Sequence, residues 1–138
     1  MGWHPYDLDH LAQEIVLKAR NCDPESLSQA YKMRATCAYG LERFWGEHLR
    51  LKVKEPSKAQ FVADVWTGFV GIMAKANVKL PAEMLSSKDS EAAIQAVAEQ
   101  LWRIKPEDQQ APLAVLTALC DAVVWWTQRL KPGKGGEG

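Results

Sequence analysis

The chain has 138 residues, of which 47% are apolar and 25% charged, and its 17 basic and 17 acidic side chains cancel. This composition is typical of one globular domain, and the zero net charge excludes a general electrostatic attraction to nucleic acid. No uninterrupted apolar run reaches the roughly 18 residues of a membrane span, and the first residues lack the basic and apolar regions of a signal peptide. We therefore expect a cytoplasmic protein that does not contact a membrane.

The first predicted helix spans residues 7–21. Asp7 is a suitable N-cap residue, and apolar side chains then recur at helical spacing. This apolar stripe consists of Leu8, Leu11, Ala12, Ile15 and Ala19.

The second predicted helix is the longest and spans residues 24–51. Pro24 suits the first position of a helix, and the stripe that follows alternates intervals of four and three residues, which is the spacing of a heptad seam. The stripe consists of Leu27, Tyr31, Arg34, Ala38, Leu41, Trp45 and His48. We expect Gly40 and Gly46, inside this helix, to let bulky side chains of a neighbouring helix approach the backbone.

Three further helices are predicted over residues 56–76, 90–104 and 112–130. The last begins at Pro112 and is apolar on nearly every side, which is typical of a helix that its neighbours cover. Asp121 is the one charged residue in the middle of this last helix.

The predicted fold class is therefore all-α, a single-domain bundle of about five helices with the hydrophobic C-terminal helix at its centre. The domain is expected to include residues 1–131. Residues 132–138 form a Gly-rich segment that has too few apolar residues to order itself, so we expect a flexible tail.

Two charged residues interrupt the apolar faces of these helices. Arg34 falls within the seam of the second helix, and Asp121 falls within the last helix. A buried charge requires a partner, so the sequence predicts a structural ion pair between Arg34 and Asp121, buried where the two helices pack. The alternative is that each side chain reaches solvent at the edge of the seam.

Candidate catalytic residues occur in the string RFWGEH, where Arg43 and His48 are separated by four residues. This string resembles the Arg-x4-His signature of HEPN-type ribonucleases, all-α proteins of this size whose dimers bring two such motifs together. The resemblance implies that Arg43 and His48 are a catalytic pair. Two features depart from the family pattern: Phe44 stands where a small polar residue is usual, and helical geometry separates the two side chains by about 140°.

No metal or cofactor site is predicted. An N-terminal cluster consists of His4, Asp7, Asp9, His10 and Glu14. His10 and Glu14 are four residues apart, so on a helix they share a face and could both contact a metal ion. A zinc site needs three or four convergent ligands, and N-capping with surface charge is the simpler interpretation of this cluster. The three cysteines include no CxxC pair and predict neither a disulfide framework nor a zinc site.

Two surfaces are candidate contacts with partners. The first is the basic run RLKVKEPSK, a candidate contact for nucleic acid or an acidic protein surface through Arg50, Lys52, Lys54 and Lys58. The second consists of the tryptophans that the apolar stripes do not account for, above all Trp102 and Trp125. Because adjacent helical residues point about 100° apart, Trp125 and Trp126 cannot share one buried face, and Trp125 and Trp102 are candidate interface residues.

The function that these patterns favour is a non-catalytic helical interaction or assembly subunit, which binds a protein partner or forms a homodimer. One alternative is a small α-helical subunit of a nucleoprotein complex that contacts nucleic acid through residues 50–58. The small subunits of CRISPR effector complexes have this length and fold class, which is an analogy of class alone. A second alternative is the HEPN-like ribonuclease.

Overall fold

The computed structural model describes residues 5–81 and 91–130, and all the regular structure in those ranges is helical. The elements in chain order are α1 (Pro5–Cys22), η1 (Pro24–Ser28), α2 (Gln29–Thr36), η2 (Cys37–Tyr39), α3 (Leu41–Leu51), α4 (Pro56–Lys75), α5 (Glu91–Trp102) and α6 (Pro106–Leu130). The predicted all-α bundle is thus confirmed. The Gly-rich tail expected at residues 132–138 lies outside the described residues.

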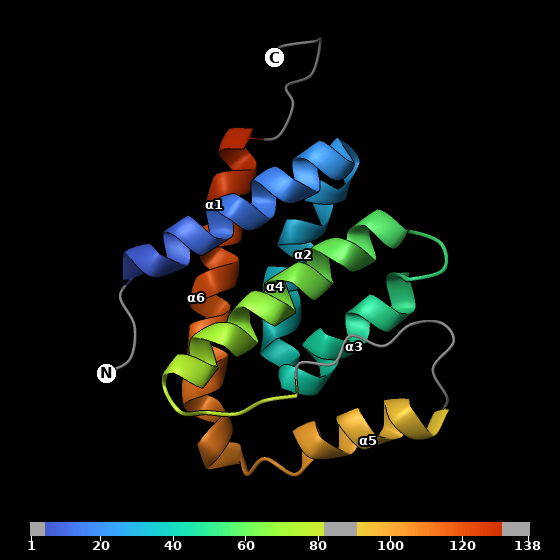
Figure 1. Ribbon diagram of the computed structural model, residues 1–138, viewed down its shortest axis with the longest axis vertical. Helices are drawn as coiled ribbons and strands as arrows, with labels where there is room; N and C mark the ends of the chain where they lie inside the picture. The colour runs from blue at the N-terminus through green and yellow to red at the C-terminus, as the bar shows by residue number, and fades with distance from the viewer. Residues whose placement is uncertain (1–4, 82–90, 131–138) are drawn as a thin grey trace.

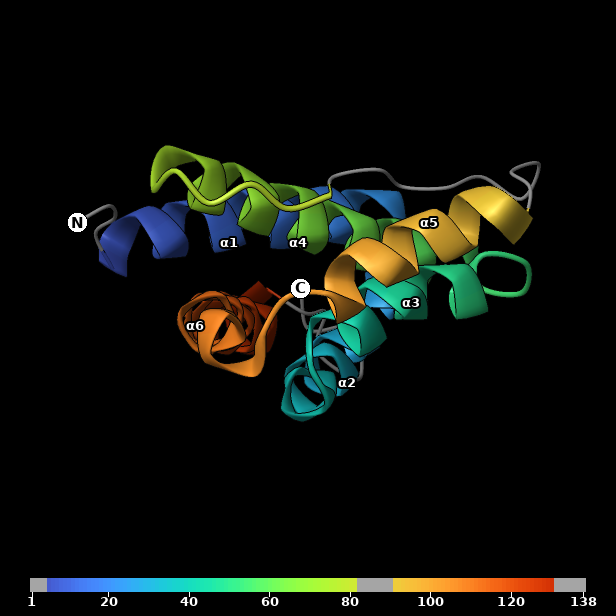
Figure 2. The ribbon, with the colours of Figure 1, turned by 90° about the horizontal axis from the view of Figure 1, so that it is seen from below.

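The helices form two layers (Figures 1 and 2). Helices α1 and α4 lie side by side in one layer, and α6 crosses beneath them next to α2. Helix α3 packs against α4 and carries α5 on its outer side, at the end of the molecule away from α1. Helix α1 also packs directly against α6, and the candidate site lies between these two helices.

Aromatic side chains fill the centre of the bundle. The largest fully buried ones are Trp45, Trp66, Phe44, Phe61 and Phe69. The Trp66 ring on α4 stacks on Phe44 of α3 with centroids 6.2 Å apart, and it lies 5.3 Å from the Phe69 ring. Its indole nitrogen donates a hydrogen bond to the Pro81 carbonyl at 2.9 Å. Trp66 therefore joins α3, α4 and the segment that follows α4.

The prediction of one helix over residues 24–51 is wrong. The chain turns at Gly40, which has φ +100° and ψ 174° and lies between η2 and α3. A residue with a side chain rarely adopts this conformation, whereas glycine does so readily. The apparent heptad seam consequently belongs to two helices of different direction, and two of its expected members, Tyr31 and Ala38, are exposed.

The glycines within helices differ in what surrounds them. A Cβ at Gly68 would lie 3.0 Å from Leu11 of α1, so Gly68 allows α1 and α4 to approach each other. A Cβ at Gly46 would meet nothing closer than a Glu42 oxygen at 3.8 Å. The expectation that Gly46 admits a bulky neighbour is therefore wrong.

Helix α6 begins at Pro106, one and a half turns before the predicted start at Pro112. Pro106 at the first position and the acidic residues Glu107 and Asp108 in the first turn both favour a helix start there. Pro112 lies inside the helix, where it lacks the N–H of one backbone hydrogen bond, and it is buried. Sequence reasoning treated Pro112 as a start signal because proline is uncommon inside helices.

One strip of α6 faces solvent, although the helix contacts α1, α2 and α4. The exposed residues of this strip are Ala114, Asp121, Trp125 and Gln128. Among the described helices, α6 is the one long and apolar enough to cross a membrane, and 44% of its most apolar stretch is buried within the fold. Core helices of globular proteins meet the same criterion.

Candidate functional site

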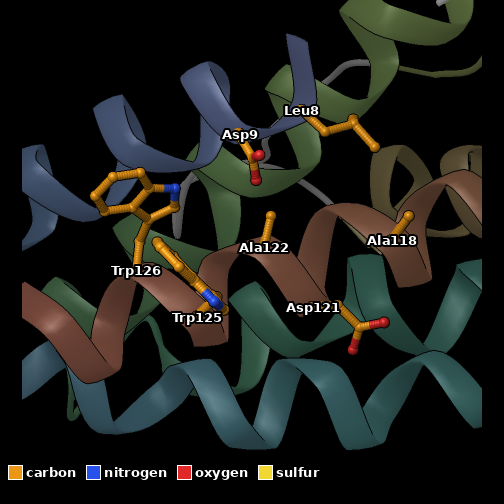
Figure 3. A pocket seen from close by; sticks show the side chains of 7 residues that line it. All are labelled: Leu8, Asp9, Ala118, Asp121, Ala122, Trp125 and Trp126. Atoms are coloured by element: carbon orange, nitrogen blue, oxygen red, sulfur yellow. The ribbon is translucent and has the colours of Figure 1, made fainter. Parts of the chain in front are cut away.

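A groove runs between the first turns of α1 and the second half of α6 (Figure 3). We call it the α1–α6 groove, and its lining residues are Leu8, Asp9, Ala118, Asp121, Ala122, Trp125 and Trp126. Its volume is about 530 Å³. Ala118 and Ala122 are one turn apart on α6, and their short side chains leave the space that larger residues would fill.

Two tryptophans form one end of the α1–α6 groove. The rings of Trp125 and Trp126 meet edge to face, with centroids 4.9 Å apart and an interplanar angle of 75°. Trp125 is 46% exposed, and the Arg129 guanidinium lies over its ring, 3.2 Å from the centroid. Trp126 is half-buried, and its indole nitrogen is buried without a hydrogen-bond partner.

Asp121 forms the predicted pair with Arg34, at 2.5 Å between Oδ1 and Nε. The expectation that this pair is buried is wrong, because the side chains of Arg34 and Asp121 are 42% and 61% exposed. The two residues lie at the edge of the contact between α2 and α6, where long side chains reach solvent. Hydrogen bonding to Asp121 is the main reason that the pKa of Arg34 is raised.

This exposure sets the effect expected of Asp121→Asn. Exposed ion pairs contribute about 0.2–1 kcal/mol, so the variant should lose less than about 1 kcal/mol of unfolding free energy, measured by urea denaturation. The double variant Arg34→Met/Asp121→Asn should be close to the single one. A loss of more than about 2 kcal/mol would instead indicate that the pair is desolvated in solution.

Two thiols lie beneath this ion pair. Cys37 on η2 and Cys120 on α6 are both buried, and neither is in a disulfide. The hydrogen bond between the thiols lowers the pKa of Cys37 and, together with burial, raises that of Cys120. Nothing in the spacing of Cys37 and Cys120 in the sequence indicates this contact.

Arg43 and His48 are on opposite faces of α3. Arg43 is exposed, with its guanidinium 5.7 Å from the centroid of the Tyr39 ring. His48 is 1% exposed, and its Nδ1 lies 2.5 Å from the Trp45 carbonyl oxygen. Its Nε2 is buried with no hydrogen-bond partner. The structure therefore separates the two residues of the HEPN-like motif and closes His48 from solvent.

Burial lowers the pKa of His48 below its usual 6.5, the hydrogen bond to the Trp45 carbonyl opposes this change, and the nearby Lys52 adds to it. The unfolded chain therefore binds a proton at this residue more readily than the folded chain does. His48 contributes its full stability above about pH 7, and this contribution is lost as the pH falls through 6.5 toward the folded pKa.

We expect the unfolding free energy of the protein to rise between pH 5.5 and 7.5, about one unit on either side of the histidine pKa. His48→Phe should flatten this rise, and His10→Asn, at an exposed position, should preserve it. Urea denaturation at several pH values measures both variants. An unchanged slope in His48→Phe would show that His48 is accessible to protons in the folded protein.

The basic run is only partly available to a partner. Arg50 pairs with Glu47 at 2.6 Å, and Lys58 pairs with Glu55 at 2.9 Å. Lys52 is half-buried, whereas Lys54 is exposed. Two of the four predicted contact residues therefore already have carboxylate partners.

A further cation joins this surface from α2. The pKa of Glu55 is lowered mainly by its hydrogen bond with Lys58, and Lys32 and Arg50 lower it further through their charges. The charge of Lys32 therefore reaches the basic run, although α3 lies between Lys32 and most of that run in the sequence. Sequence reasoning missed Lys32 because only the turn at Gly40 brings α2 back toward this end of α3.

Trp102 projects from a different part of the molecule. It is 63% exposed at the end of α5 and lines a concavity of about 510 Å³ with Gln95, Ala96 and Glu99. The described residues of this lining all belong to α5.

Within residues 5–81 and 91–130, no group of three or more His, Cys, Asp or Glu side chains could hold a metal ion. His4 of the N-terminal cluster lies outside these ranges.

Comparisons with protein-family models, with curated proteins and with solved structures found no match to this chain. The function is therefore argued from the surfaces described above.

Proposed function

We propose that this protein is a non-catalytic helical interaction module that binds a protein partner in the α1–α6 groove. The observation that carries the proposal is the exposed Trp125 beside Trp126 at the end of a groove of about 530 Å³. Large aromatic residues at a concave surface are typical anchors of protein interfaces. Trp125 is 46% exposed and Trp126 is half-buried, so a partner side chain can pack against both rings.

The α1–α6 groove is favoured over the surface around Trp102. Two helices form the walls of the groove, so a bound side chain would be enclosed from both sides. The described residues around Trp102 all come from α5, and none of them is a second aromatic residue. Trp102 therefore serves as a matched control, as an exposed tryptophan outside the proposed site.

Selection of peptides from a displayed random library against the immobilised protein tests this proposal. We expect enriched peptides to bind the wild type and to lose affinity for Trp125→Ser by about tenfold or more, since anchor residues at interfaces are worth about 2 kcal/mol. Trp102→Ser should bind as the wild type does. The proposal is overturned if no peptide is enriched, or if the enriched peptides depend on Trp102 rather than Trp125.

A second copy of the chain is one partner that could use this surface. Sedimentation velocity at low and high protein concentration measures this directly. A dimer that Trp125→Ser dissociates would make the partner a second copy, and a monomer at every concentration would make it a different protein. A dimer that persists in Trp125→Ser would place the self-contact elsewhere.

A subunit of a nucleoprotein complex is the second candidate function. The charge of Lys32 helps to lower the pKa of Glu55, the partner of Lys58, and this supports the candidate because it adds a cation from α2 to the basic run. Fluorescence anisotropy with single-stranded RNA at two salt concentrations tests this candidate. Binding that strengthens at low salt and is lost in Lys32→Glu/Lys54→Glu would support a nucleic-acid role. An affinity that depends neither on the salt concentration nor on these substitutions would refute it.

A HEPN-like ribonuclease has less support. Its catalytic pair would require Arg43 and His48 on one accessible surface, whereas His48 is buried in this conformation. RNA that remains intact after long incubation with the protein would exclude this activity, and cleavage lost in His48→Ala would support it.

We also propose a cytoplasmic location. Its support is composition, because three cysteines without a CxxC pair or a disulfide framework are ordinary for a protein of a reducing compartment.

A further inference from the structure

We propose that the side chain bound in the α1–α6 groove is cationic and belongs to an arginine of a basic peptide segment. This inference rests on the proposed function and specifies the chemistry of the partner. Its first support is charge: the groove is lined by the carboxylates Asp9 and Asp121, and the other lining residues within the described ranges are uncharged. Figure 3 shows the two carboxylates on different helices, Asp9 on α1 and Asp121 on α6.

Asp9 is the carboxylate that carries the electrostatic argument. Arg34 already binds one oxygen of Asp121, which offsets part of its charge. Asp9 is exposed, and no ion pair within the described ranges involves it. A partner cation would therefore bind Asp9.

The aromatic rings provide the second support. A guanidinium over an indole face gains about 0.5–1 kcal/mol at an exposed site and more when desolvated. Trp125 already binds one guanidinium in this way, since Arg129 lies 3.2 Å from its ring centroid. The face of the Trp125 ring can therefore hold a planar cation. The ring of Trp126 lies edge to face with that of Trp125 and provides a second aromatic surface beside it.

The buried indole nitrogen of Trp126 favours a peptide over a free cation. Figure 3 shows this nitrogen on the side of the ring that faces Asp9, and it has no hydrogen-bond partner. A buried donor without an acceptor is costly. If the Trp126 side chain turns so that this nitrogen reaches the groove, a backbone carbonyl beside the bound arginine can accept the hydrogen bond, whereas an amine ligand has no acceptor to offer.

The expected preference is for arginine over lysine. A guanidinium is planar, stacks on indole faces and can donate two parallel hydrogen bonds to one carboxylate, whereas an ammonium offers only a compact charge. The short side chains of Ala118 and Ala122 leave room for the long arginine stem to lie along α6.

Nuclear magnetic resonance of the indole N–H groups tests the inference with three probes: tetra-arginine, tetra-lysine and tetra-glutamine peptides. Each of the six tryptophans contributes one indole N–H signal, and single Trp→Phe variants assign these signals. We expect tetra-arginine to shift the Trp125 and Trp126 signals, tetra-lysine to do so several-fold more weakly, and tetra-glutamine not to do so. The Trp102 signal should remain in place with all three.

Three variants complete this test. Asp9→Asn should weaken tetra-arginine binding about fivefold, a loss of about 1 kcal/mol, and Asp108→Asn, which removes the same charge at the other end of α6, should not. Ala118→Leu should block the groove without changing its charge. Circular dichroism establishes that each variant is folded.

Three results would overturn the inference: equal shifts at Trp102, equal binding of tetra-glutamine, or unchanged affinity in Asp9→Asn. A different result would overturn the proposed function itself. If selected peptides bind at Trp125 but are neutral or acidic, the interaction module stands and the cationic partner is wrong. If no peptide binds at Trp125, both are wrong.

Discussion

Trp66→Ala is expected to lower the free energy of unfolding by about 3–5 kcal/mol, the range for deleting a large aromatic side chain from a core. The variant removes a fully buried ring that stacks on Phe44 and contacts Phe69, and it leaves the Pro81 carbonyl without its donor. Because Trp66 joins α3 to α4, few alternative contacts can close the cavity. Urea denaturation followed by circular dichroism measures the loss.

Two further variants make this expectation specific. Trp66→Phe retains a ring but loses the hydrogen bond, and it should cost clearly less than the alanine variant. Trp102→Ala removes the same side chain from a position that is 63% exposed, and surface substitutions usually change stability by about 0.5 kcal/mol or less. Equal losses in Trp66→Ala and Trp102→Ala would contradict the described packing.

Gly40→Ala is expected to cost about 1–3 kcal/mol, the usual cost of holding a residue in a sparsely populated backbone conformation. The cost arises from the backbone and not from crowding. A Cβ at Gly40 would meet no atom closer than a Gln109 oxygen at 4.0 Å, whereas φ is +100°. Thermal or urea denaturation of the variant measures this strain.

Gly46→Ala is the matched control, because Gly46 lies inside α3 and a Cβ there would make only an ordinary contact with a Glu42 oxygen at 3.8 Å. Alanine favours a helix over glycine by up to about 1 kcal/mol, so this variant should be more stable than the wild type. If Gly40→Ala were also stabilising, the chain would continue as one helix through residue 40, as the heptad spacing predicts.

The sequence predicted the helices whose ends carry strong local signals. Asp23 and Pro24 mark the start of η1, and Pro56 marks the start of α4. The spacing of apolar residues could not reveal the break at Gly40, because a glycine inside a helical pattern is compatible with both a helix and a turn. The turn depends on α2 and α3 packing against different neighbours, which is tertiary information.

The candidate site was predicted only in part. Trp125 was a candidate because it adjoins Trp126 on a helix, and Asp121 was a candidate because it is a charge in an apolar helix. Asp9 and Leu8 could not be assigned to the same site, since only the packing of α1 on α6 brings them there. The pairing of Arg34 with Asp121 was foreseeable from charge alone, but its exposure depends on where α2 and α6 meet.

The claim that this protein binds a partner in the α1–α6 groove is tested most directly by calorimetric titration of the strongest selected peptide against matched variants. We predict that Trp125→Ser lowers the affinity by about tenfold or more, which is a loss of at least about 1.4 kcal/mol, while Trp102→Ser stays within about twofold of the wild type. The reverse order, or equal affinities for all three proteins, would contradict the claim.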